Sequence, residues 1–479
     1  MDLARVRELV DLPVRELSGR CSGELNLRYN PEGVVDHLTC QLKVAGLSVR
    51  AASGPPVTAA EAGIDLAASI DSYAGKLKVQ SLRVRVPGLQ ADADGVVYLD
   101  VFDRNWQAIE NAHVKGTVQP AELAALLPGD VTLPWGLTVE GPVAVEASVE
   151  HAGPTMRVAW AFDARGATLR RGGAVIKPDG RPLAASVKAN LDDRTWRCDV
   201  PEDGQLKVTV GANEFRGWGF LGSLEERLGR LSGAKSPLTL ARIRQEAVGV
   251  NWTGSWTVAD LPSLLELTGL PPLAGDWVIR GAISGRASIK PGLDEQPLGE
   301  VTVHLPEETS LSLGGQVQKA AGKAASLMVR TQIEDNGAGL RGGDVELTAG
   351  AGRLGLRGLS VRQEGEGLQR VGGSFDAQRV EDLLACLVHP LPGKARIQGD
   401  LRGQAWVVFG PGRRLQDVLR GAEVHVDASE ALLDLPGVLF KKARDNASAT
   451  MDLSREAAPE GMRYHLPSAP GRKARWRRR

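Results

Sequence analysis

The sequence predicts a mainly β protein, built as an elongated array of antiparallel strands with one short helix in each repeat. Three observations support this fold class. Apolar and polar residues alternate in many short segments, the alternation gives way to helical spacing at intervals, and 57 of the 479 residues are glycine. A repeat that cannot bury its apolar face alone is stabilised by stacking on its neighbours, which favours an array over separate β-domains joined by helices.

Alternation with a period of two residues identifies the strands and the side chains that share an apolar face. In the segment VEGPVAVEASVE, valines occupy odd positions and glutamates lie between most of them. One apolar and one solvated face are typical of antiparallel sheets. The apolar positions selected on this basis are Val139, Val143, Val145, Val149, Leu206, Val208, Val210, Leu354 and Leu356. A change of phase at Ser81 predicts a turn or a bulge.

A helical motif recurs three times without gaps, as GTVQPAELAALL, GSWTVADLPSLL and GSFDAQRVEDLL. Its leading glycines, Gly116, Gly254 and Gly373, lie 138 and 119 residues apart. Each copy has a bulky residue two positions later and then an apolar triplet at helical spacing. The triplets are Leu123, Leu126 and Leu127; Leu261, Leu264 and Leu265; and Val380, Leu383 and Leu384. We expect each helix to close one end of a β-unit.

A second motif, in which an apolar residue precedes a glycine by two positions, follows each helix at Val139, Ile279 and Ile397. The N-terminal segment LSGRCSGEL has the same form, and Val6, Leu9 and Val10 before it match the helical triplet, so we expect a fourth copy that begins within the motif. Paired glycines occur in three copies, as Gly19 and Gly23, Gly281 and Gly285, and Gly399 and Gly403. Their strand-like surroundings predict bends or bulges.

The motifs divide the chain into four β-repeats and a tail. The expected boundaries are 1–113, 114–251, 252–370 and an incomplete 371–455, followed by a basic and disordered tail at 456–479. Within the second repeat, Leu221, Leu224, Leu228 and Leu231 have helical spacing. They predict a helix that packs on the sheet or lies at a membrane interface.

Composition and motifs argue against several function classes. Lys and Arg together number 58, as do Asp and Glu, so no net charge favours nucleic acid. The four cysteines and seven histidines are dispersed, and no metal-ligand spacing or disulfide framework is predicted. No nucleophile elbow or phosphate-binding loop occurs. We expect a protein that is not an enzyme and needs no cofactor.

The recurring motifs resemble the AsmA/TamB-like family of bacterial envelope proteins. The matching pieces are Gly116 with Leu126 and Leu127, Gly254 with Leu264 and Leu265, Gly373 with Leu383 and Leu384, and residues 17–23. The resemblance extends from residue 1 to about 453. It implies a twisted sheet curled into a groove with an apolar lining, along which lipid acyl chains move between membranes during envelope or outer-membrane biogenesis.

The same resemblance implies location and partners. The partners would be phospholipid or another acyl-chain lipid, the membrane and other envelope proteins, and the location periplasmic with attachment to the inner membrane. Such proteins usually carry an N-terminal transmembrane anchor. This sequence has no run of 18 apolar residues and no signal core at its start, so we expect a fragment of a longer protein or a start assigned too late.

Alternation alone leaves other arrangements and functions open. Two sheets whose apolar faces meet in a β-sandwich produce the same pattern as an open groove. A structural or adhesive β-repeat protein of the envelope, with no lipid-transfer activity, is therefore the alternative function. An enzyme that acts on an envelope polymer is a third.

Overall fold

In the computed structural model the chain forms two compact units, which we describe separately. Unit 1 comprises Met1–Gly233 with Pro262–Leu270, and unit 2 comprises Ala234–Leu261 with Pro271–Arg479. Both are mainly β with antiparallel pairing, as the sequence predicts. The structure describes residues 14–32, 34–51, 57–99, 108–126, 137–192, 195, 197–223, 249–268, 277–292, 297–313, 317–319, 321–333, 340–365, 368–387, 396–410, 419–435, 439–444, 448–458 and 461–465.

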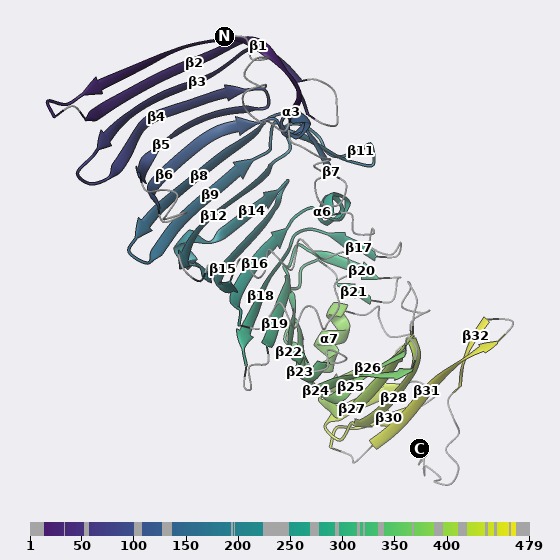
Figure 1. Cartoon of the computed structure of the whole chain (residues 1–479). Coiled ribbons are helices and arrows are strands. Elements are labelled where there is room, and N and C mark those ends of the chain that lie inside the picture. The colour runs from purple at the N-terminus through teal and green to yellow at the C-terminus, as the bar shows by residue number, and fades with distance from the viewer. Residues whose placement is uncertain are drawn as a thin grey trace. The chain divides into compact units, whose positions relative to one another are not determined.

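The sheet of unit 1 follows chain order from its first strand (Figure 1). Near its end, two short strands, β13 and β14, lie between β12 and β15 and pair with both. The strands are β1 (Val14–Tyr29), β2 (Val35–Ala51), β3 (Val57–Asp71), β4 (Lys76–Val86), β5 (Leu89–Tyr98), β6 (Ile109–Val118), β8 (Val143–Ala152), β9 (Thr155–Asp163), β12 (Leu183–Asp192), β13 (Arg197–Val200), β14 (Leu206–Val210) and β15 (Asn213–Ser223).

The sheet of unit 2 is built in the same way, each strand pairing with the next one named here. Its strands are β16 (Asn251–Val258), β18 (Ile283–Pro291), β19 (Pro297–Leu305), β22 (Ala325–Ile333), β23 (Leu340–Ala349), β24 (Gly352–Gly365), β25 (Leu368–Gln378), β27 (Leu401–Phe409), β28 (Leu419–Asp427), β31 (Ser448–Ala458) and β32 (Gly461–His465). The expected start of the tail, residue 456, falls inside β31. Residues 466–479 lie outside the described residues.

Of two local predictions in unit 1, the bulge at Ser81 is confirmed and the helix that begins at Leu221 is not. The change of phase at Ser81 is a bulge, because the register of β4 shifts there against both β3 and β5. The prediction of a helix from Leu221 onward is wrong for its first residue. Leu221 belongs to β15, whose residues Gly222 and Ser223 pair with β13, so strand pairing overrides the helical spacing. Leu224, Leu228 and Leu231 lie outside the described residues.

The three predicted helices are present: α3 (Pro120–Leu126), α6 (Leu261–Thr268) and α7 (Val380–Leu387). Each lies in the chain between two strands of the main sheet that pair with each other, β6 with β8, β16 with β18, and β25 with β27. The helix therefore belongs to a crossover connection between neighbouring antiparallel strands. Leu127 lies outside the described residues, as do Val6, Leu9 and Val10.

Each crossover also contributes the first strand of a small three-stranded sheet, which we call a side sheet. The side sheets are β7 (Leu137–Glu140), β10 (Thr168–Arg171) and β11 (Ala174–Lys177); β17 (Trp277–Arg280), β20 (Ser310–Leu313) and β21 (Val317–Lys319); and β26 (Arg396–Gly399), β29 (Ala431–Leu435) and β30 (Leu439–Lys441). The apolar residue of the second sequence motif pairs with a leucine in every case: Val139 with Leu169, Ile279 with Leu311, and Ile397 with Leu433.

Glycine is required where the chain passes from a side sheet to the main sheet. Gly141, Gly281 and Gly399 have φ of +99°, +93° and +96° there. A Cβ on Gly399 would lie 2.6 Å from the carbonyl oxygen of Glu430, and one on Gly281 would lie 3.0 Å from Cα of Thr309. A positive φ and this close approach both exclude larger residues. Gly281 and Gly399 are therefore bends, as the sequence predicts, and Gly141 makes an equivalent bend that was not predicted. Gly285 and Gly403, by contrast, lie inside regular strands.

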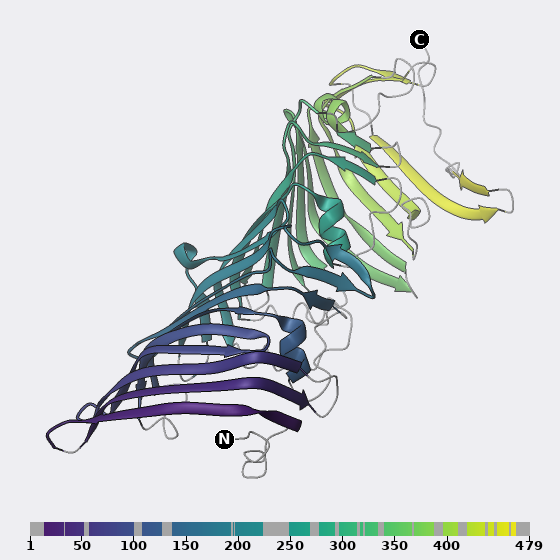
Figure 2. The same cartoon turned by 90° about the horizontal axis from the view of Figure 1, so that it is seen from above.

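Helices α3 and α7 lie at one end of the long strands of their units, beside a side sheet (Figures 1 and 2). Each packs on the turn of a preceding hairpin. A Cβ on Gly88, in the β4–β5 turn, would lie 2.6 Å from the backbone nitrogen of Leu123 in α3. A Cβ on Gly352, at the β23–β24 turn, would lie 2.8 Å from Cγ of Leu383 in α7.

The core around α7 is small and rich in alanine. Val380, Leu383 and Cys386 of the helix are buried against Ala325, Ala349 and Ala377 of the sheet. Small side chains on the strands leave room for the helix to approach the sheet closely. The junction between β26 and β27 is tied to the helix as well, because the carboxylate of Glu381 accepts a hydrogen bond from the backbone nitrogen of Gly399 at 2.9 Å.

Candidate functional site

The strand register in unit 1 brings apolar residues from consecutive strands onto one face. Residues directly opposite each other in neighbouring antiparallel strands carry their side chains on the same face, so the register defines rows of side chains. One row crosses nine strands, from β1 to β12, and consists of Leu25, Cys40, Leu66, Leu82, Ala93, Val114, Ala147, Trp160 and Val187. At a strand spacing of about 4.8 Å, this row is roughly 38 Å long. We call this the apolar face of unit 1.

The next row on the same face is free of charged and polar side chains. It consists of Gly23, Leu42, Ile64, Val84, Ala91, Gly116, Val145, Phe162, Ala185, Val208 and Phe215. The two adjacent rows carry no charged side chain and form a continuous apolar strip, in which the indole N–H of Trp160 and the thiol of Cys40 are the hydrogen-bonding side-chain groups. Such a strip can contact hydrocarbon at little cost in unsatisfied hydrogen bonds.

Side chains of this strip are open to solvent in the described part of unit 1. Leu25 is 60% exposed, Trp160 41%, Val114 37% and Ile64 36%. The largest completely buried side chains anywhere in the described residues are Lys177, Lys319, Asn213, Thr309 and Cys386. No large aliphatic or aromatic side chain is among them, whereas a sandwich of two sheets buries such residues between its layers.

Unit 2 has an apolar face of the same kind. One row crosses β16 to β27 and consists of Trp256, Gly285, Val303, Leu327, Leu347, Leu354, Ala377 and Leu401. A neighbouring row consists of Gly254, Ala287, Val301, Val329, Val345, Leu356, Phe375, Gly403 and Val426. Val301 is 40% exposed and Leu327 is 37% exposed. Helix α7 covers one end of this face, where Ala325, Ala349 and Ala377 lie.

The opposite face of the unit 1 sheet is polar. Its central row consists of Glu24, Gln41, Asp65, Arg83, Asp92, Lys115, Glu146, Ala161, Ser186, Lys207 and Arg216. Ion pairs join neighbouring strands there, such as Arg83 Nε to Asp92 Oδ1 at 3.5 Å. Exposed pairs of this kind add at most about 1 kcal/mol each. These ion pairs favour exposure of this face to water and do not provide binding energy for a ligand.

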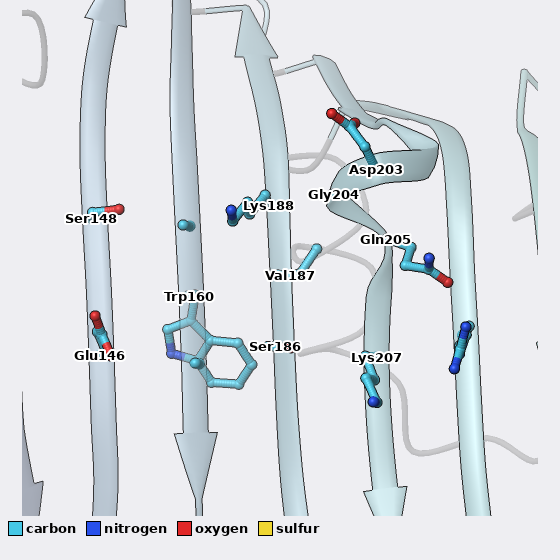
Figure 3. Close-up of a pocket in the computed structure, with 13 residues that line it drawn as sticks. Glu146, Ser148, Trp160, Ser186, Val187, Lys188, Asp203, Gly204, Gln205 and Lys207 are labelled. Carbon is cyan, nitrogen blue, oxygen red and sulfur yellow. The ribbon is translucent and has the colours of Figure 1, made fainter.

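A pocket of about 440 Å³ lies on this polar face, where the 3₁₀ turn Glu202–Gly204 borders β12 and β14 (Figure 3). Its charged lining residues are Lys188, Lys207, Arg216, Glu146 and Asp203, and none of its lining residues is a histidine or cysteine. Both Lys207 and Arg216 contact the carboxylate of Glu214, and Glu146 Oε1 lies 3.2 Å from Nε2 of His113. Three of the five charged lining residues are therefore paired with a neighbouring side chain.

The other reactive side chains are the cysteines and the groups that could bind a metal ion. None of the four cysteines forms a disulfide, and burial raises the pKa of the Cys198 thiol to about 11, so that it stays protonated at neutral pH. Among the described residues, no group of three His, Cys, Asp or Glu residues could hold a metal ion. No described helix has the length and apolar character needed to cross a bilayer.

The structure places most of the selected apolar residues together. Val143, Val145 and Val149 of β8 share the apolar face of unit 1 with Leu206, Val208 and Val210 of β14. Leu354 and Leu356 of β24 share the apolar face of unit 2. Val139 does not join them, because it pairs with Leu169 in a side sheet and the bend at Gly141 separates it from β8.

The strand register places further residues on the apolar faces that the sequence alternation did not select. Those exposed to solvent include Leu25, Leu27, Ile64, Val114 and Trp160 in unit 1, and Val301 and Leu327 in unit 2. The alternating pattern around Val114 and Trp160 was a usable signal, since Lys115 and Arg157 occupy the other phase. Which residues of different strands lie side by side depends on pairing, and sequence periodicity carries no information about pairing partners.

Comparison of the chain with models of protein families, with curated protein sequences and with solved structures finds no match. The resemblance of the motifs to the AsmA/TamB-like family therefore rests on their residues alone.

Proposed function

We propose that this protein binds lipid acyl chains on its apolar faces and acts as a non-enzymatic component of the bacterial cell envelope, in envelope or outer-membrane biogenesis. The observation that carries the proposal is the exposed apolar strip of unit 1, from Leu25 on β1 to Trp160 on β9. Soluble proteins seldom leave a large continuous apolar surface in water, and such surfaces commonly mark ligand, membrane or protein contacts.

Acyl chains fit this surface better than polar ligands. Each methylene that leaves water contributes about 0.8 kcal/mol, and a saturated chain needs no hydrogen-bond partner. The rows consist mostly of aliphatic residues and glycine, so few polar groups could fix one position along the strip. A bound chain can therefore move along the row while it stays out of water. Phospholipid is the natural ligand for such a surface, and the membrane its source.

The resemblance of the repeated helix and glycine motifs to AsmA/TamB-like proteins supports the envelope assignment. It also supports a groove as the shape of the lipid-binding surface and a periplasmic, inner-membrane-associated location. Other envelope proteins are the partners that this assignment implies. A structural or adhesive role without lipid is the alternative, and it predicts that the purified protein carries no lipid.

The proposal predicts that lipid co-purifies with the protein and is lost when the exposed strip is made polar. The test variant combines Leu25→Gln, Val114→Gln and Trp160→Gln, whose side chains are exposed, so the cost to folding is small. Mass spectrometry of a solvent extract should show phospholipid on the wild type and at least about fivefold less on the variant, equivalent to ~1 kcal/mol.

The matched control carries Glu24→Gln, Lys115→Gln and Ala161→Gln, which lie on the same three strands but on the polar face. It should retain the wild-type amount of phospholipid. A wild-type protein without lipid, or equal losses in both triple variants, would favour the structural alternative.

A further inference from the structure

Trp160 of β9 carries the strongest hydrogen-bond donor of the apolar strip in unit 1. Its indole N–H donates and cannot accept, whereas the thiol of Cys40, the other polar group of the strip, is a weak donor. The Trp160 side chain is 41% exposed, and its Nε1 has no hydrogen-bond partner within the described residues. This N–H is therefore available to an acceptor that a ligand brings to the strip.

The side chains around this N–H are apolar. Ala147 and Val187 lie directly opposite Trp160 on the two neighbouring strands, and Val158 and Phe162 lie before and after it on the same face of β9. The centroids of the Trp160 and Phe162 rings are 5.2 Å apart at an interplanar angle of 56°, a favourable tilted arrangement that holds the indole in place. A hydrogen bond in such surroundings is stronger than one in water.

The acceptor that suits this position is an uncharged oxygen attached to hydrocarbon. A phosphate group placed on the strip would lose its hydration without gaining a counter-ion, because neither row carries a charged side chain. The carbonyl oxygen of an acyl ester has no charge, and it is joined directly to the hydrocarbon that the strip accommodates. A phospholipid can therefore place its ester on the strip while its headgroup stays in water.

The strip continues much further on one side of Trp160 than on the other. Towards β12 the row that contains Trp160 has one more member, Val187. Towards β1 it continues through Ala147 and Val114, and it spans about 24 Å from Trp160 to Leu66 on β3. An acyl chain whose carboxyl end lies at Trp160 thus finds a continuous apolar surface in the direction of β1.

We propose that the indole N–H of Trp160 donates a hydrogen bond to an ester carbonyl oxygen of a bound phospholipid. This bond positions the carboxyl end of one acyl chain at β9 and directs its methyl end towards β1. The inference rests on the proposed function and adds to it a preferred position, an orientation and a class of lipid. Trp160 is a positioning residue that favours ester-linked over ether-linked chains.

A competition between two lipids tests the hydrogen bond. The full chain is loaded from vesicles with equal amounts of dioleoyl phosphatidylcholine and its dialkyl ether analogue, which lacks both carbonyl oxygens. Mass spectrometry of a solvent extract should show about fivefold more ester lipid than ether lipid on the wild type, the effect of one net hydrogen bond. Trp160→Phe keeps a ring but loses the N–H, so its ratio should fall to about one. Because the ratio is taken within one sample, partial loss of folding or loading does not change it.

Trp406 of β27 provides the matched control. It lies on the opposite face of the unit 2 sheet from Leu401 and Gly403, directly across from Glu423. The guanidinium of Arg370 covers its ring, 5.0 Å from the centroid. Trp406→Phe removes the same N–H group outside the apolar faces, and it should keep the wild-type ratio of ester to ether lipid.

Photoreactive phospholipids test the orientation of the chain. A diazirine is placed next to the ester in one probe and at the methyl end of the acyl chain in the other. On the wild type, peptide mapping should locate the first label on β8, β9 or β12 and the second on β4 to β6. With Trp160→Phe the two probes should label the same strands, because the chain no longer has a preferred position.

Several results would overturn the proposal while the proposed function stands, because lipid is bound in each of them. These are equal loading of the two lipids by the wild type, an ester preference that Trp160→Phe retains, an equal loss of preference in Trp406→Phe, and wild-type labelling that does not differ between the two probes. A wild type that takes up neither lipid would instead overturn the proposed function, and the role of Trp160 with it.

Discussion

Replacing Lys319 with methionine is expected to lower the free energy of unfolding of unit 2 by about 3 kcal/mol. Lys319 ends β21, is completely buried, and has no carboxylate within ion-pair distance in the described residues. Its ammonium group donates hydrogen bonds to the backbone carbonyls of Pro306, at 2.7 Å, and Thr309. These carbonyls belong to the turn that joins β19 of the main sheet to β20 of the side sheet. Without the ammonium group, buried carbonyl oxygens lose their donor.

Lys177 occupies the equivalent place in unit 1. It ends β11, is 1% exposed, and donates to the carbonyls of Arg165 and Pro178, both at 3.2 Å, and of Ala167. In each side sheet the lysine pairs in register with a leucine, Lys177 with Leu169 and Lys319 with Leu311. We therefore expect Lys177→Met to destabilise unit 1 in the same way.

Chemical denaturation followed by circular dichroism measures the effect, with Lys323→Met as the control. Lys323 lies in the exposed turn just after β21, and its replacement should leave stability within about 0.5 kcal/mol of the wild type. Equal stability of Lys319→Met and Lys323→Met would show that the ammonium group does not hold the turn.

The same lysine makes stability depend on pH. Burial lowers the pKa of the Lys319 amine from its usual 10.5, opposed by the carboxylates of Glu308 and Glu307. The unfolded chain consequently binds more protons than the folded chain in the range below 10.5. Stability contributed by this group rises with pH in that range. The wild type should gain stability relative to Lys319→Met between neutral pH and about pH 10, and a gain of equal size in both proteins would contradict this.

Replacing Leu383 with aspartate is expected to destabilise unit 2 by about 4 kcal/mol or more. Leu383 is 8% exposed and packs against the alanines of the sheet beneath α7. Truncation of a buried leucine alone costs about 2–5 kcal/mol, and burial of an unpaired carboxylate adds to that cost. Unfolding monitored by calorimetry should show the loss. Hydrogen exchange should also increase in β23 and β24, which α7 covers.

Ala385→Asp provides the matched control, because Ala385 is an exposed residue of the same helix. It adds the same charge at a distance of two residues, and we expect little change in stability. If Leu383→Asp unfolds at the same temperature as the wild type, α7 does not hold the end of its β-unit, and the structural role of the helical motif fails.

Local features of the fold could be predicted because their signals lie within a few residues of one another. The triplet Val380, Leu383 and Leu384 marks α7, and the change of phase at Ser81 marks the bulge in β4. Leu221 shows the limit of such signals. Its spacing from Leu224 suits a helix, but pairing of β15 with β13 and β14 determines its conformation.

Features that depend on contacts between distant segments could not be predicted from local patterns. Lysine is ordinarily a surface residue, so nothing local identifies Lys177 and Lys319 as buried. Their repetition was the available signal: Lys177, Lys319 and Lys441 end the third strands of the three side sheets and lie 142 and 122 residues apart.

The candidate site was predictable only where its residues follow a local alternating pattern. Alternation identified apolar positions such as Val145 and Val208, and the structure places both in one row of the apolar face of unit 1. It also selected Val139, which has the right phase. The positive φ of Gly141 interrupts that phase, and the valine belongs to a side sheet instead. The phase of the alternation predicts which face a residue occupies only within one continuous strand.

Photo-crosslinking at two adjacent positions of β6 tests most directly whether acyl chains occupy the apolar face. A benzophenone amino acid is placed at Val114 in one variant and at Lys115 in another. The two residues are neighbours in the chain but lie on opposite faces of the sheet. After irradiation of protein loaded with phospholipid, mass spectrometry should detect a lipid adduct at position 114 and none at position 115. No adduct at either position, or equal adducts at both, would contradict the account.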